Sequence, residues 1–296
     1  GHQKAITALT LSGSTTSPTF FTGSYDGRVC AWHYGRDGER AAAVPLGGAG
    51  HANQVTSIVI QGDALLSAGM DDVVRVGSVE GVAYGSTALP TGSQPRTVAV
   101  ADDGTYVVAT LENVQVYDKS HRKLAISSNL GYNPTTVAIS PDGSIVVVGG
   151  EDSQPHAYTL TPGTGDLSPL AVPISPTRGA VSALAISRST PPLLAAGDAQ
   201  GKIQVYDLTT GATVISQWVF HSGRISSLAW SNDGKFVVSG GLDTNVFVWS
   251  VDRPGKRVQI KKAHTAGVNG VGFVGENKVV SAGQDATVKV WEVVLP

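Results

Sequence analysis

The stretch from His221 to Trp249 reads HSGRISSLAWSNDGKFVVSGGLDTNVFVW, and its features decide the fold. Apolar and polar residues alternate through Ile225–Trp230 and again through Val246–Trp249, which is the period of half-buried β-strands. Between them, Ser231–Gly234 has the residues that a tight hairpin turn requires, and Ser140–Gly143 repeats that turn earlier in the chain. The pattern predicts short antiparallel strands joined by turns, and no convincing amphipathic helix.

Four residue types recur together at fixed distances along the chain. A His stands four residues before a β-branched residue; further on, a Ser or Thr is followed four residues later by an Asp and usually six residues after that by a Trp. The sets are His2, Thr22, Asp26 and Trp32; His51, Ser67 and Asp71; His221, Ser239, Asp243 and Trp249; and His264, Ser281, Asp285 and Trp291. In the second set Gly77 stands where a Trp is expected. Three weaker units in the middle of the chain carry Tyr117, Tyr158 and Tyr206 at the aromatic position.

Seven such units follow one another, and their length identifies the architecture. Four short strands in roughly 40 residues make up one blade of a β-propeller, and this spacing of His, Ser or Thr, Asp and Trp is typical of WD repeats. We therefore predict an all-β, seven-bladed WD-repeat β-propeller that forms a single domain over residues 1–296. The expected blades cover residues of about 1–49, 50–91, 92–129, 130–174, 175–219, 220–263 and 264–296.

The last unit is expected to lack its outer strand. Its pattern predicts strands at about 268–274, 278–282 and 287–294, and no residues remain for a fourth. The propeller should then have 27 strands if the other six blades are complete. We expect a segment outside this sequence to supply the missing strand, which would leave the edge of the last blade open here.

The repeated His, Ser, Asp and Trp set is interpreted as structural and not catalytic. A buried carboxylate is costly without hydrogen-bonding partners, and the other three side chains can provide them. A catalytic triad would occur once, with an exposed nucleophile, whereas this set occurs in four units. The seven His residues show no zinc-ligand spacing, and Gly47–Gly50 lacks the Lys-Ser/Thr of a phosphate-binding loop. We therefore expect no enzyme activity, no catalytic residue, no metal site and no cofactor.

Charge and cysteine content exclude further classes of protein. The 21 Lys and Arg residues against 23 Asp and Glu residues give a net charge of −2, so no basic field exists to hold nucleic acid or a membrane surface. The single cysteine, Cys30, cannot form an internal disulfide. No apolar stretch is long enough to span a bilayer. A reducing, cytoplasmic compartment is the expected location.

Several motifs resemble one protein family. The stretch Ser216–His221 (SQWVFH) runs into the His221–Trp249 repeat, and the chain ends with Ser281–Asp285 (SAGQD) and Trp291–Leu295 (WEVVL). Together with Arg253-Pro254, these motifs resemble the C-terminal half of the actin-interacting protein 1 family, and the similarity covers essentially the whole chain. One departure is Gly69-Met70, where Ser-Trp is expected.

The resemblance implies a function and partners. The family looks like two seven-bladed propellers in tandem that act without covalent chemistry, with cofilin on actin filaments, to promote filament disassembly. Actin, cofilin and the N-terminal propeller would then be the partners, and the actin cytoskeleton the location. The alternative is a general WD-repeat scaffold or substrate-receptor subunit of another complex. A phosphopeptide reader would need several Arg residues at the channel mouth, where only Arg224, Arg96 and Arg178 are candidates.

Physical position suggests which residues contact a partner, although no contact motif of the family can be matched in this chain. Residues just before the turn Asp of a blade, and those between the His and the first strand, should surround the central channel on one face. The candidates are Lys4, Tyr25, Asn53, Met70, Glu151, Arg224, Leu242 and Gln284. The basic run Arg253–Lys262 could contact an acidic partner, but is more simply an outer strand with a solvated, charged edge.

Overall fold

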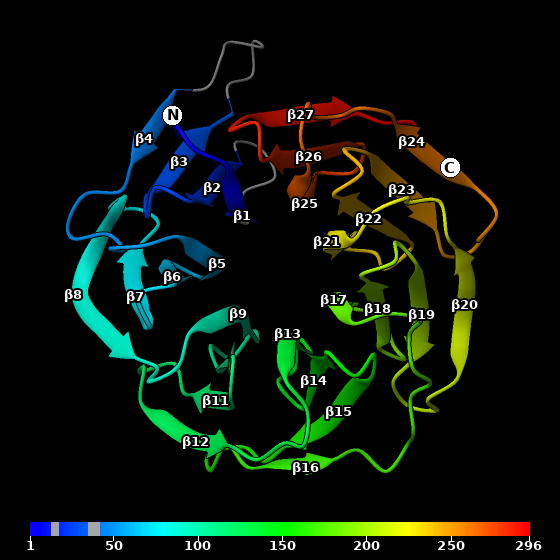
Figure 1. Cartoon of the computed structure of the whole chain (residues 1–296), viewed down its shortest axis with the longest axis horizontal. Coiled ribbons are helices and arrows are strands. Elements are labelled where there is room, and N and C mark those ends of the chain that lie inside the picture. Colours follow the sequence, from blue (N-terminus) through cyan, green and yellow to red (C-terminus); the bar gives the residue numbers. More distant parts are fainter. Residues whose placement is uncertain (13–17, 35–41) are drawn as a thin grey trace.

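Seven small antiparallel sheets are arranged in a ring around a central channel (Figure 1). This architecture is seen in a computed structural model, which describes residues 1–12, 18–34 and 42–296. Six sheets have four strands each and the seventh has three, giving 27 strands within the described residues. The prediction of an all-β, seven-bladed propeller with a three-stranded last blade is confirmed.

Each blade consists of consecutive strands, the first next to the channel and the last at the outer edge. The first three blades contain β1 (Ile6–Leu11), β2 (Thr19–Ser24), β3 (Val29–His33) and β4 (Ala43–Pro45); β5 (Val55–Gln61), β6 (Ala64–Gly69), β7 (Val73–Ser78) and β8 (Ala83–Pro90); and β9 (Pro95–Val100), β10 (Tyr106–Thr110), β11 (Val114–Tyr117) and β12 (Lys123–Ser127). The fourth and fifth contain β13 (Pro134–Ile139), β14 (Ile145–Gly150), β15 (Pro155–Leu160) and β16 (Leu167–Pro169); and β17 (Val181–Ile186), β18 (Leu193–Asp198), β19 (Ile203–Asp207) and β20 (Thr213–Trp218). The last two contain β21 (Ile225–Trp230), β22 (Phe236–Gly241), β23 (Val246–Ser250) and β24 (Arg257–Ile260); and β25 (Val268–Val274), β26 (Lys278–Gly283) and β27 (Val288–Glu292).

The second strand of each blade is buried almost throughout, because neighbouring blades cover both of its faces. In β22 and β26, for example, every residue after the first is buried. These strands therefore read as continuous runs of small and apolar residues, whereas the inner strands β1 and β17 begin with alternating buried and half-buried residues. The apolar core thus lies between blades, in layers such as Phe21, Val55 and Leu65 between the first and second.

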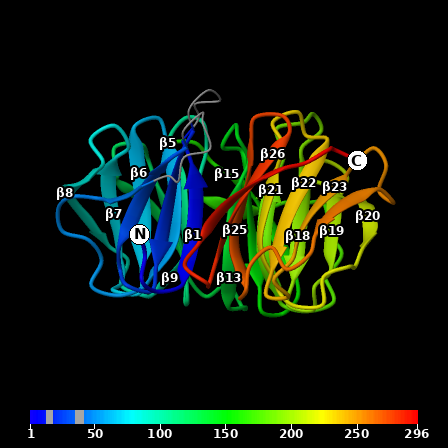
Figure 2. The same cartoon turned by 90° about the horizontal axis from the view of Figure 1, so that it is seen from above.

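Tight turns join the first two strands of several blades at one face of the ring. In the blade that begins with β13, Gly143 donates its N–H to the carbonyl of Ser140 at 2.9 Å, and the Ser140 hydroxyl accepts the Ile145 N–H at 2.9 Å. We call this side of the ring the hairpin face. The turns between second and third strands lie on the opposite side, which we call the turn face (Figure 2 shows the ring edge-on).

The ring closes where the first and last blades meet face to face. Here β1 and β25 lie side by side (Figure 2), and Asn269 Nδ2 donates to the carbonyl of Ile6 at 2.7 Å. Phe20, Val274 and Val280 form the apolar layer between the two blades. Within the described residues no strand pairs with the outer edge of β27, so the seam is held by packing and this inner contact, without a shared sheet. No helix in the described ranges is long and apolar enough to cross a membrane.

Candidate interaction face

Four hydrogen-bonded side chains tie together the turn face of the blade that begins with β21. His221 Nδ1 lies 2.9 Å from Asp243 Oδ1, and its Nε2 lies 2.8 Å from the hydroxyl of Ser239. Trp249 Nε1 donates to the same hydroxyl at 2.8 Å, and Asp243 Oδ2 accepts the N–H of Ser222 at 2.9 Å. The network therefore fixes the segment that enters the blade against the turn between β22 and β23.

The same arrangement holds three other blades, with one variation in the first. The corresponding His–Asp and His–Ser/Thr distances are 2.9 and 2.8 Å for His264 with Asp285 and Ser281, 2.8 and 2.8 Å for His51 with Asp71 and Ser67, and 3.4 and 2.8 Å for His2 with Asp26 and Thr22. Trp32 and Trp291 donate to Thr22 and Ser281 at 2.6 and 2.9 Å. In the first blade Ser24 stands where Gly241 stands in the sixth. A Cβ on Gly241 would lie 2.8 Å from His221 Nδ1. The first blade has the Ser24 side chain at this position, and there the His2–Asp26 distance is the longest of the four, at 3.4 Å.

The second blade completes its network with an aromatic residue from a neighbouring strand. Tyr84, on β8, places its hydroxyl 3.1 Å from Ser67 Oγ, where the other networks have an indole N–H. Gly77 pairs with Tyr84 across β7 and β8, and a Cβ on Gly77 would lie 3.5 Å from the Tyr84 ring and 2.9 Å from the carbonyl oxygen of Ala83. The missing Trp is thus replaced by a Tyr from the next strand, and the glycine leaves room for it. Burial raises the pKa of Tyr84 to about 12.

The networks are buried, and in three of them burial opposes protonation of the imidazole. Burial lowers the pKa of His2, His51 and His264, against the opposing effect of the neighbouring carboxylates. Burial by itself would raise the pKa of Asp243, but hydrogen bonds from His221 and from the Ser222 N–H lower it to about 2. Ser67, Ser239 and Ser281 are fully buried, so these Ser, His and Asp groups present no hydroxyl to a substrate.

The third, fourth and fifth blades lack these networks and replace them with other contacts. Val108, Val148 and Ala196 occupy the Ser position. In the third blade Thr91 stands at the His position, the amide of Gln115 donates to the Thr91 carbonyl at 2.7 Å, and the Tyr117 hydroxyl donates to Gln115 at 2.7 Å.

In the fifth blade Thr177 takes the His position. Its hydroxyl donates to the carbonyls of Ser153 and Gly179, at 2.9 and 2.8 Å, so a threonine again replaces the imidazole at the blade entrance. The hydroxyl of Tyr206, at the aromatic position, is buried and has no partner among the described residues.

One backbone hydrogen bond is repeated in all seven blades and defines the rim of the turn face. A residue at the start of each turn donates its N–H to the carbonyl of the residue that precedes the first strand, at 2.8–3.1 Å. The donors, which we call the rim residues, are Tyr25, Met70, Leu111, Glu151, Ala199, Leu242 and Gln284. Since the bond is made by the backbone, it places the residue at the rim whatever its side chain.

The rim contains five of the residues that the spacing predicted and two that it missed. Leu111 and Ala199 were missed because their blades have no Ser and no turn Asp at the expected spacing, although an apolar residue directly after Thr110 was a usable signal. Tyr25, Met70, Leu111 and Leu242 are among the few large apolar side chains that are exposed, with Tyr25 at 54% and Leu242 at 45%. The first three belong to consecutive blades and form one apolar arc.

The remaining predicted residues occupy two different positions. Arg224 directly precedes β21 and lines the central channel. Lys4 and Asn53 are exposed and lie one residue further from their strands, outside the set that lines the channel; the Asn53 side chain accepts the N–H of Gln54 at 2.8 Å. The three residues thus do not form a single class, as the spacing had suggested.

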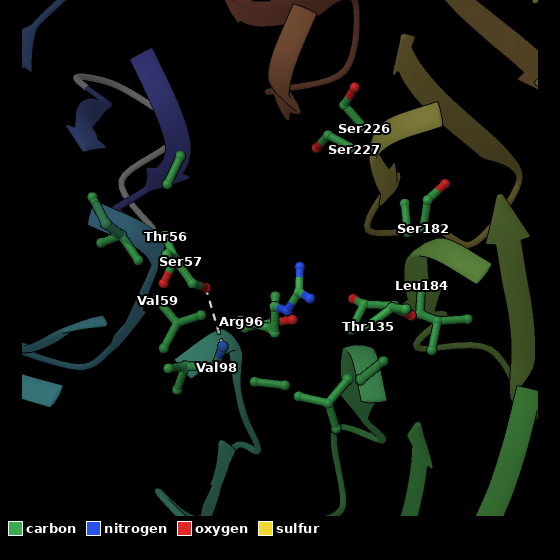
Figure 3. Close-up of a pocket in the computed structure, with 18 of the residues that line it drawn as sticks. Thr56, Ser57, Val59, Arg96, Val98, Thr135, Ser182, Leu184, Ser226 and Ser227 are labelled. Atoms are coloured by element: carbon green, nitrogen blue, oxygen red, sulfur yellow. Dashed lines mark hydrogen bonds between the residues drawn. The ribbon is translucent and has the colours of Figure 1, made fainter. Parts of the chain in front are cut away.

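The channel is a cavity of about 550 Å³ lined mainly by the inner strands of the blades (Figure 3). Hydroxyl groups dominate the labelled polar side chains, among them Thr56, Thr135 and Ser182. Ser182 donates to the carbonyl of Ile225 in the next blade at 2.7 Å. The only charged side chains among the described lining residues are Arg96 and Arg224, and Arg96 projects into the open channel (Figure 3).

The basic run forms part of the outer surface, far from the rim. Its residues Arg257–Ile260 make up β24, the outermost strand of the sixth blade. The guanidinium of Arg257 lies 3.3 Å from the ring centroid of the exposed Phe220, a cation–π contact.

Comparison with known proteins places this architecture among WD-repeat proteins. The model described as "WD domain, G-beta repeat" matches residues 1–33, 213–250 and 255–292. The crystal structure of the computationally designed Ika8 protein superposes with a TM-score of 0.70 over 99% of this chain and 98% of that chain, at 23% sequence identity. It supports the fold alone.

Curated relatives match almost the whole chain. It is 38% identical to the 66 kDa stress protein of Physarum polycephalum, 34% identical to actin-interacting protein 1 of Drosophila melanogaster, and 32% identical to WD repeat-containing protein 1-A of Xenopus laevis, in each case over 99% of this chain. The chain spans about half the length of these relatives, 46% or 47% of each. The resemblance to the actin-interacting protein 1 family is confirmed: the chain is a WD-repeat β-propeller that is similar to about half the length of each of these relatives.

Proposed function

We propose that this propeller is a non-enzymatic protein-interaction platform that binds actin filaments together with cofilin and promotes their disassembly, in the cytoplasm. The partner is suggested by the name of the Drosophila relative, actin-interacting protein 1. The observation that carries the proposal is the apolar arc of Tyr25, Met70 and Leu111. Its exposed side chains occupy equivalent positions in three consecutive blades, whose backbones are held rigidly by the repeated hydrogen bond.

The arc has the properties of a binding surface. Exposed apolar patches mark interaction sites, and aromatic side chains such as that of Tyr25 are enriched among the residues that contribute most binding energy. Because the repeated backbone hydrogen bond already fixes the three rim residues, little backbone entropy is lost when a partner binds.

Co-sedimentation with bare and cofilin-decorated actin filaments tests the proposal. The variant Tyr25→Ser/Met70→Ser should lower the affinity for decorated filaments at least about tenfold, because it removes two central apolar contacts. The control is Ile126→Ser, which changes an equally exposed apolar residue on the outer strand β12. Equal binding by both variants and the unchanged protein would contradict the role of the arc. No binding by the unchanged protein would favour a general scaffold with other partners.

The open edge of β27 supports a further part of the proposal, which is pairing with the other propeller of a tandem protein. The unpaired N–H and C=O groups of an edge strand are a template for another strand. We propose that a segment linked to the N-terminal propeller completes this sheet. Amide hydrogen exchange at Val288–Glu292 should then be markedly slower in a protein that contains both halves than in residues 1–296 alone. Equal exchange rates would contradict this pairing.

A further inference from the structure

The mouth of the central channel holds two arginines that lack sufficient counter-charge. Arg96 begins the third blade and Arg224 the sixth, so they approach from nearly opposite sides of a seven-bladed ring. Both lie at the end of the channel that opens on the turn face, because each stands at the start of an inner strand. They are the only charged residues among the described ones that line the cavity, in a chain whose net charge is −2.

Neither guanidinium is fully paired. Arg96 Nη2 lies 3.9 Å from Glu151 Oε1, and the other carboxylate oxygen of Glu151 accepts a hydrogen bond from Asn133 at 3.0 Å. The Arg224 guanidinium takes part in none of the ion pairs or hydrogen bonds of the described residues. Both residues are exposed at the channel mouth, so their unpaired donors face solvent, and partial burial together with the charge of Arg96 lowers the pKa of Arg224.

One arginine on the hairpin face of the same protein has its guanidinium paired with a carboxylate. Arg188 makes a two-pronged contact with Asp102 of another blade, with N–O distances of 2.6 and 2.7 Å. In this geometry the two oxygens of a carboxylate accept two parallel N–H donors of the guanidinium. The donors of Arg96 and Arg224 at the channel mouth are therefore available to an anion that enters from the turn face.

We propose that the channel mouth is a binding site for a single carboxylate, the side chain of an Asp or Glu that a protein partner inserts between Arg96 and Arg224. The charge balance favours this group over a phosphate: two arginines and Glu151 leave one positive charge, which matches a monoanion. Met70 lines the same cavity. The partner would therefore carry an apolar residue next to its inserted acidic residue, and that apolar residue would pack on the apolar arc.

This inference rests on the proposed function, because it names the chemistry by which the rim face recognises its partner. A direct probe keeps the two separable. Fluorescein-labelled hexaglutamate, followed by fluorescence anisotropy, should bind the unchanged protein saturably, whereas hexalysine should not. The variant Arg96→Gln/Arg224→Gln should weaken hexaglutamate binding at least about tenfold. The control Arg122→Gln, which removes a highly exposed Arg in the turn after β11, should bind as the unchanged protein does.

The outcomes divide clearly. Displacement of hexaglutamate by inorganic phosphate, at an ionic strength matched with chloride, would overturn the choice of carboxylate. Equal hexaglutamate affinity of the double variant would overturn the site itself. In filament co-sedimentation the double variant should bind at least about tenfold more weakly than the unchanged protein. If the unchanged protein and the double variant bind filaments equally well, the carboxylate site is wrong while the proposed function stands. If the unchanged protein binds no filaments, the proposed function fails, and the peptide titration still tests the carboxylate site.

Folding of the variants can be checked independently. Arg224 is exposed and makes no ion pair or side-chain hydrogen bond with the described residues, so Arg224→Gln should leave the thermal midpoint almost unchanged. A loss of binding with an unchanged or higher midpoint separates recognition from stability.

Discussion

Two arcs of the same ring achieve one backbone fold by different chemistry. Blades one, two, six and seven, which are contiguous across the seam, each hold a buried His–Asp pair with a bridging hydroxyl, at distances such as 2.8 Å between His51 and Ser67. Blades three to five replace the hydroxyl with Val108, Val148 or Ala196 and fill the space with tyrosines. The backbone hydrogen bond at the rim is nevertheless present in all seven.

The difference shows that the buried imidazole and the hydroxyl are kept or lost together, whereas the turn Asp can remain without them, as the exposed Asp152 does in the fourth blade. A lone buried His or Asp would cost free energy, so a blade that lacks the hydroxyl lacks the imidazole too. The networks are concentrated on both sides of the seam, where no shared sheet closes the ring. The four changes below test this contrast between arcs, from the largest expected effect to the smallest.

Removing the central hydroxyl should be severe in one arc and mild in the other. Ser239→Ala leaves His221 and Trp249 with buried, unpaired nitrogens and should lower the free energy of unfolding by about 2–4 kcal/mol. The reverse change, Ala196→Ser, offers a partner to the unpaired Tyr206 hydroxyl and should alter stability by less than about 1 kcal/mol. Urea unfolding of both variants decides; similar losses would mean that the two arcs do not differ in this way.

Acid should weaken the arc that contains the networks. The pKa values of His2, His51 and His264 are lowered in the folded state, so these residues bind protons more readily when unfolded, where the pKa is about 6.5. Their contribution to stability is present above that value and is lost as the pH falls toward the folded pKa values. The urea midpoint should therefore be lower at pH 5 than at pH 7.5.

Carboxylates extend this loss to lower pH. Asp243, whose pKa falls from 3.8 to about 2 on folding, should add to the instability only below about pH 4. The variant His264→Asn should show a smaller change between pH 7.5 and pH 5 than the unchanged protein. A midpoint independent of pH over that range would show that the imidazoles do not titrate on unfolding.

Two tyrosines offer a matched test of a single hydroxyl. Tyr84→Phe removes the partner of Ser67 and should cost about 1 kcal/mol, whereas Tyr206→Phe removes a buried hydroxyl that has no partner and should be neutral or stabilising. Thermal unfolding of the pair measures the difference. The expectation fails if Tyr206→Phe is the more damaging change.

The smallest effect is expected at Ser24. The change Ser24→Gly restores the residue found at Gly241 and should let the His2–Asp26 distance shorten from 3.4 Å toward 2.9 Å. The gain in hydrogen bonding is opposed by the greater freedom of glycine in the unfolded chain, so stability should change by less than about 0.5 kcal/mol. A crystal structure of the variant reports the distance, and an unchanged 3.4 Å would show that Ser24 is not its cause.

The fold was predictable because the motif that identifies a blade occurs four times in the sequence. His, Ser or Thr, Asp and Trp recur with fixed spacing, and the residue before each Asp, such as Tyr25 or Met70, could be assigned to the rim from that spacing alone. Features formed between strands or blades were beyond reach. Tyr84 replaces a Trp from another strand, and although Arg96, Arg178 and Arg224 could be named as candidates for the channel mouth, only the structure shows that Arg96 and Arg224 line the cavity and Arg178 does not.

The backbone bond at the rim has a consequence for how such a protein diversifies. The main chain holds each rim residue in place. The seven rim side chains, which are Tyr, Met, Leu, Glu, Ala, Leu and Gln in chain order, can therefore be substituted without changing the fold. Selection can therefore change the binding specificity of the ring one rim residue at a time. Protein engineering could do the same, with the effect of each substitution on partner choice measured separately from its effect on stability.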